Sequence, residues 1–71
     1  MTHEDDTLAQ ANRHIADAIR RIADQRACIA MLRRKGHGTA GAEELLGLLE
    51  TALALMVEHR DLILHDLGRD P

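Results

Sequence analysis

The sequence predicts an all-α protein: an antiparallel two-helix hairpin that associates with a second copy into a four-helix bundle, a homodimer. Three observations lead to this fold class. Apolar residues repeat every seven positions in the first half, a short glycine-containing break follows, and the second half carries more apolar surface than one helix can cover. The 71 residues are expected to form one unit, 1–71, because a chain this short supports a single small core.

A first helix is predicted from about residue 7 to residue 35. Its apolar stripe has seven-residue periodicity and comprises Leu8, Ala11, Ile15, Ala18, Ile22, Ile29 and Leu32. Gln25 is the polar exception within this stripe. Thr7 and Gln10 fit a capping box, which places the start of the helix near Thr7.

A turn is predicted at residues 36–39, and a second helix from about residue 40 to residue 67. Gly36 can adopt the left-handed conformation that closes a helix, and Thr39 is a good N-cap for the next one. Such a short connection favours two antiparallel neighbours. With the turn as reference, residues that face each other across the hairpin have numbers that sum to about 75.

The charge distribution supports the same pairing of helices. Residues 13–35 hold seven Lys or Arg and two Asp, a net charge of +5, whereas residues 36–71 hold two Arg and seven Asp or Glu, a net charge of −5. A basic helix next to an acidic one is favoured over either helix beside its own parallel copy. Each exposed ion pair adds only about 0.2–1 kcal/mol, so the charges guide the pairing more than they stabilise it.

The second helix has surplus apolar surface. It offers twelve large apolar residues against seven in the first helix, and they span an arc of about 220°, where a stripe of about 100° is usual. Four of them can face the first helix: Leu45, Leu49, Met56 and Ile63. A second set remains uncovered at seven-residue spacing: Leu48, Leu55 and Leu62. We expect these residues to form the self-association interface; the alternative is a monomer whose apolar face binds another protein.

One charged pair is predicted inside the apolar pattern. Arg26 lies beside Ile19 and Ile22 in the stripe of the first helix, and Glu50 is the single charge between Leu45 and Val57. Because both residues fall at the same height of the hairpin, we expect them to pair. The arginine stem would pack on leucines while its head reaches the carboxylate.

Histidines suggest an alternative function, a metal-binding four-helix bundle. His14 lies near His59 in the predicted register, and a two-fold bundle could bring two copies of each together. Neither helix has the spacing of a known dimetal motif, so no metal or cofactor is predicted. Cys28, the single cysteine, is expected to be a small residue on the flank of the helix.

Several other functions are disfavoured by the composition. The chain has no serine nucleophile and no phosphate-binding motif, and two thin helices offer little room for a pocket, so no enzyme is expected. The net charge of −3 and the acidic neighbour helix argue against nucleic acid, although an accessory nucleic-acid-associated dimer remains an alternative. No segment reaches the length of a membrane span, and the acidic start is unlike a signal peptide. A cytoplasmic location is therefore expected.

The turn region carries a family resemblance. Residues 33–46 read Arg-Arg-Lys-Gly-His-Gly-Thr-Ala-Gly-Ala-Glu-Glu-Leu-Leu and are followed by Leu53, Met56, His59-Arg60 and Leu62-Ile63. This pattern resembles small uncharacterised helical-hairpin proteins of alphaproteobacteria, which commonly read Gly-His-Asp-Thr at the turn, where this chain has Gly38. The resemblance covers about residues 8–65 and implies a cytoplasmic bacterial helical hairpin, with no activity to carry over. The sequence thus predicts a self-associating interaction module, an adaptor or a regulatory subunit.

Overall fold

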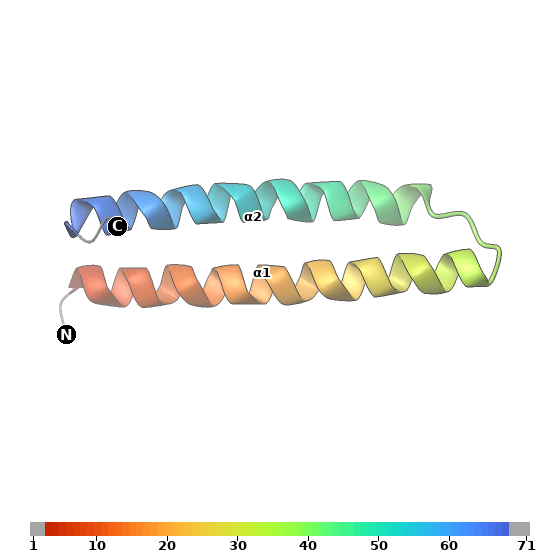
Figure 1. Ribbon diagram of the computed structural model, residues 1–71, viewed down its shortest axis with the longest axis horizontal. Helices are drawn as coiled ribbons and strands as arrows, with labels where there is room; N and C mark the ends of the chain where they lie inside the picture. Colours follow the sequence, from red (N-terminus) through yellow and green to blue (C-terminus); the bar gives the residue numbers. More distant parts are fainter. Residues whose placement is uncertain (1–2, 69–71) are drawn as a thin grey trace.

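The computed structural model describes residues 3–68 of the chain, with side chains from residue 6 onward. Helix α1 spans His3–Arg34 and helix α2 spans Ala40–Asp66. The two helices lie antiparallel along their whole length, so that α1 begins and α2 ends at the same end of the molecule (Figure 1). The molecule is a rod of 51 × 18 × 18 Å. The prediction of an all-helical antiparallel hairpin is confirmed.

A glycine closes α1 in the way that the sequence indicates. Gly36 has a φ of 72°, in the left-handed region. The His37 N–H donates to the Leu32 carbonyl (2.9 Å) and the Gly36 N–H donates to the Arg33 carbonyl (3.0 Å). These two bonds form a Schellman motif, which satisfies carbonyl groups that the end of a helix would otherwise leave without a donor. The chain then leaves α1 toward its neighbour.

The start of α1 differs from the predicted one, whereas α2 begins at Ala40 as predicted. Helix α1 begins at His3, four residues before Thr7, because an acidic segment suits the first turn of a helix and needs no cap at Thr7 to continue. Thr39 occupies the predicted N-cap position of α2. Its hydroxyl donates to the Glu43 carboxylate (3.3 Å) and does not accept from a backbone N–H. Thr39 therefore links the turn to the Glu43 side chain in the first turn of α2.

The buried core belongs to α1 alone. Its members all come from the predicted stripe with seven-residue periodicity: Ala11, Ile15, Ala18, Ile22 and Ile29. Helix α2 has no buried residue among those described. The side chains of α2 that cover the core are half-buried and alternate at spacings of four and three: Ala42, Leu46, Leu49, Leu53, Met56, Arg60 and Ile63. One helix is therefore well covered and the other is not.

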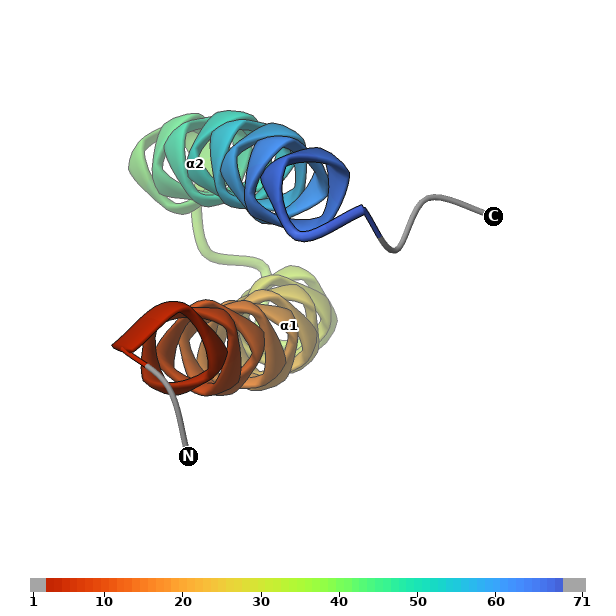
Figure 2. The same cartoon turned by 90° about the vertical axis from the view of Figure 1, so that its left-hand side faces the viewer.

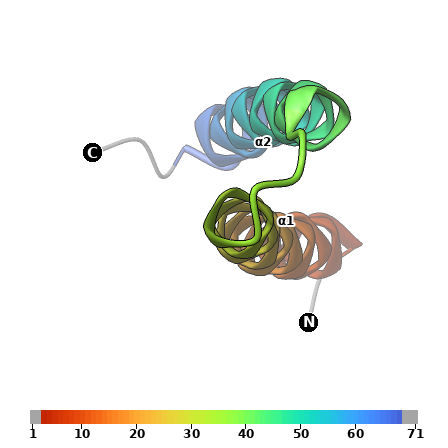
Figure 3. The same ribbon diagram turned by 90° about the vertical axis from the view of Figure 1, so that its right-hand side faces the viewer.

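Views along the rod show the reason for this asymmetry. The two helices stand as a single pair, crossing at a small angle, and each has one neighbour only (Figures 2 and 3). A helix with one neighbour can bury only a narrow stripe. The buried alanines and isoleucines of α1 form such a stripe. The broad apolar arc of α2 exceeds that stripe, so a large part of it faces outward.

Candidate interaction surface

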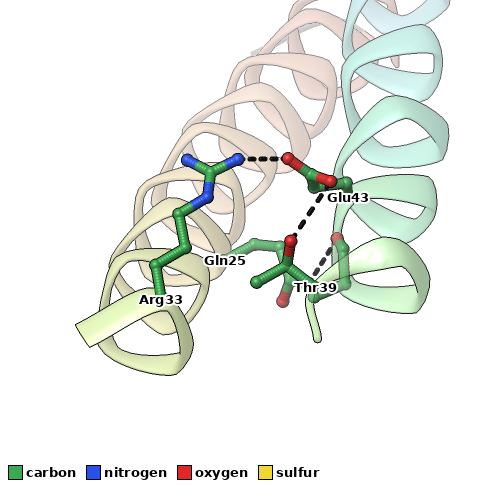
Figure 4. A network of polar contacts seen from close by, with 5 residues as sticks. Gln25, Arg33, Thr39 and Glu43 are labelled. Carbon is green, nitrogen blue, oxygen red and sulfur yellow. Dashed lines mark hydrogen bonds and ion pairs between the residues drawn. The ribbon is translucent and has the colours of Figure 1, made fainter. Parts of the chain in front are cut away.

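A polar network fixes the hairpin near the turn (Figure 4). The Gln25 side-chain amide donates to the Ala42 carbonyl (2.9 Å), and Arg33 forms an ion pair with Glu43. Gln25 is the polar exception in the α1 stripe, and this bond across the hairpin gives it a partner. The Arg33–Glu43 pair was not predicted, although 33 and 43 sum to 76, close to the predicted register of about 75.

The predicted pair of Arg26 and Glu50 is present. Arg26 Nη2 lies 2.9 Å from Glu50 Oε2, and these residue numbers also sum to 76. Both ion pairs sum to 76, close to the predicted 75, because these long side chains reach toward each other along the helices. The Gln25–Ala42 bond joins residues whose numbers sum to 67, so the backbones of the two helices are offset from the predicted register by several residues. The expected burial of the arginine is wrong: the side chains are 61% and 47% exposed, because the pair lies at the edge of the helix interface rather than inside it.

This ion pair borders an apolar groove along one side of the hairpin. The groove has a volume of about 500 Å³ and is lined on α1 by Ile19, Ile22 and Ala23 and on α2 by Leu53, Ala54 and Val57. Ile19 is 53% exposed there. The groove is a strip of surface left between two round helices where no third helix covers it.

The opposite side of the hairpin, here called the Asp17 face, is polar on α1 and apolar on α2. His14, Asp17 and Arg21 lie along a second groove, opposite half-buried Ala52 and Met56. Asp17 forms ion pairs with both Arg20 and Arg21; Arg21 Nε lies 3.1 Å from Asp17 Oδ2. The carboxylate of Asp17 is therefore held on α1 itself.

The outer leucine stripe, Leu48, Leu55 and Leu62, is exposed as predicted. The exposed fractions are 64%, 61% and 61%. Leu49, Met56 and Ile63 are half-buried on the side toward α1, also as predicted. Leu45 is a correction: it is 46% exposed and lies at the edge of the outer stripe, because the apolar arc of α2 is wider than α1 can cover.

The histidines and the cysteine are dispersed. His14 lines the groove of the Asp17 face, and His59 is exposed on α2. Over residues 6–68 no three His, Cys, Asp or Glu side chains are grouped so that they could hold a metal ion. Cys28 is a free, half-buried thiol. Within the described part of a single hairpin, His14 and His59 therefore belong to no such cluster.

Comparison of this chain with protein-family models, with curated proteins and with solved structures found no match. The resemblance seen at residues 33–46 stays a prediction. Neither helix, over the residues described, is long and apolar enough to cross a membrane. The exposed leucines of α2 are the feature on which a functional proposal can be based.

Proposed function

We propose that this chain is a non-enzymatic interaction module that self-associates through the outer leucine stripe into a homodimeric four-helix bundle and acts as an adaptor or a regulatory subunit. One observation carries the proposal. Three leucines at seven-residue spacing are 61–64% exposed on a helix that has no buried residue among those described. Exposed leucines in such a line are costly in water, so a partner that covers them stabilises the molecule.

A second copy of the chain is the occupant that best fits this surface. Seven-residue spacing is the repeat by which helices pack on one another, and the same chain presents the same repeat. The long face of the rod measures 51 by 18 Å, or about 900 Å². A stable interface needs about 800 Å² from each partner, so one face of the hairpin is large enough.

The polar groups of the hairpin support a binding role over a catalytic one. Asp17 is engaged by Arg20 and Arg21, and Glu43 by Arg33, so these carboxylates hold neighbouring cations. The apolar groove is lined mainly by aliphatic side chains, with the Arg26–Glu50 pair at its edge. Such surfaces suit helix packing, which needs no reactive group.

The decisive test is Leu55→Glu, at the centre of the outer leucine stripe. We expect this variant to be a monomer or insoluble, because a carboxylate buried in the interface without a partner costs several kcal/mol. Sedimentation velocity measures the change in mass. Circular dichroism checks that a monomeric variant keeps its helices.

Ala27→Glu is the matched control, since it adds the same carboxylate at an exposed position of α1. We expect its mass in sedimentation to equal that of the parent chain. Leu55→Ala provides a milder change, and it should weaken the dimer without adding a charge. An unchanged oligomer for Leu55→Glu would remove the leucine stripe as the interface.

A further inference from the structure

We propose, building on the self-association above, that His59 lies inside the dimer interface and that its protonation weakens the dimer. The association then depends on pH in the range where an imidazole gains its proton. The neighbours of His59 within one hairpin carry this inference, whichever way the second copy runs along it.

The two flanks of the outer leucine stripe differ in polarity. Each leucine of the stripe has neighbours on both flanks, at spacings of three and four residues. On the flank away from the Asp17 face these neighbours are exposed and polar: Glu44, Thr51 and Glu58. On the flank next to the Asp17 face they are Leu45, Ala52 and His59. The apolar surface of the stripe therefore continues only on the side of His59.

A second copy that covers this apolar surface must also cover His59. The neighbours of this residue three and four positions away are all large and apolar. Leu55 and Leu62 are 61% exposed on one side of it, and Met56 and Ile63 are half-buried on the other. His59 itself is exposed in a single hairpin. It is thus a titratable group within a surface that association removes from water.

The carboxylates of α2 that lie nearest the leucine stripe are at its edges. Glu44 and Glu58 are on the polar flank, on the side away from His59. Asp66 follows His59 by seven residues, about 10 Å along the helix, at the end of α2. A second copy whose α2 packs on this one therefore brings apolar side chains or a second imidazole to His59, and leaves the carboxylates in water.

On α1, the titratable groups nearest to the level of this imidazole are His14 and Asp17. Both line the groove with Met56, one helical turn before the imidazole along α2. Asp17 is bound by two arginines of α1, so its charge is already compensated. Asp6 and Asp24 lie about two helical turns or more from His14, in opposite directions. A second copy whose α1 packs on this face therefore brings no uncompensated carboxylate to the imidazole.

The sign of the pH effect follows from these neighbours. A protonated imidazole is a cation, and burial without a carboxylate beside it disfavours the charged form. Each copy must therefore release the proton of His59 before the dimer forms. The dimer is strongest at about pH 7.5 and above, and it weakens as the pH falls toward about 6, because the imidazoles of the separated copies then gain protons.

Sedimentation equilibrium at about pH 7.5 and about pH 6 tests the inference. Histidine is the ordinary side chain that changes charge in this range. We expect the dissociation constant of the parent dimer to rise about tenfold at the lower pH, since association releases two protons per dimer. His59→Gln keeps a neutral polar side chain and should lose this dependence. His37→Gln, in the exposed turn, is the matched control and should keep it.

The outcomes separate the two proposals. A dissociation constant that is equal at the two pH values, or lower at the acidic one, overturns the role of His59 but keeps the self-association. If His59→Gln retains the pH dependence and His14→Gln loses it, the other histidine near the interface is responsible and the assignment to His59 fails. A parent chain that is monomeric at both pH values overturns both proposals.

Discussion

Arg26 and Glu50 show how an ion pair can link two helices while adding little to their stability. The two side chains are 61% and 47% exposed, so water screens their attraction. We expect a double-mutant cycle with Arg26→Ala and Glu50→Ala to give a coupling of about 0.2–1 kcal/mol in urea denaturation. Coupling below the error of the measurement would show that the two charges act independently.

At the scale of the helix, the end of α1 depends on Gly36. Its φ of 72° is strained for any residue with a Cβ atom, although the space around it is open. Gly36→Ala should therefore cost about 1–2 kcal/mol of unfolding free energy. Gly38→Ala is the matched control, because Gly38 lies in the same turn, in open space, without a positive φ. Equal stability of the two variants in urea denaturation would contradict this role of Gly36.

The two helices were predictable to different degrees. The stripe of α1 came directly from the sequence, because its apolar residues fill one narrow line and leave only one way to face a partner. The apolar arc of α2 allows several directions, so spacing alone could not tell that Leu45 faces out while Leu46 faces in. The start of α1 was missed because a capping box at Thr7 and a longer acidic helix are both compatible with the residues there.

The candidate surface was predictable in part, for a related reason. Seven-residue spacing identified Leu48, Leu55 and Leu62 as uncovered, since this depends only on periodicity. The grooves on either side of the hairpin depend on how far two round helices stand apart, which no pattern of residues gives. The bond from Gln25 to the Ala42 carbonyl was likewise beyond prediction, because every residue offers a carbonyl.

At the scale of the whole molecule, the absence of buried residues in α2 over the described part of the chain links folding to association. If the dimer completes the core, its melting temperature must depend on protein concentration. A tenfold rise adds about 1.4 kcal/mol per dimer, so we expect Tm to increase by several degrees. Calorimetry over a hundredfold range of concentration measures this shift. A constant Tm would contradict coupled folding and association.

The shared end of the two helices also determines how the molecule bears a mechanical load. The start of α1 and the end of α2 lie at the same end of the rod (Figure 1). A force that pulls these two ends apart therefore separates the helices progressively, one turn after another. The half of the hairpin that contains the start of α1 and the end of α2 separates first. The ion pairs Arg26–Glu50 and then Arg33–Glu43 come under force only afterwards. A pull between the turn and the open end runs along the rod and loads both helices lengthwise. The hairpin is thus compliant in one direction and stiff in the other.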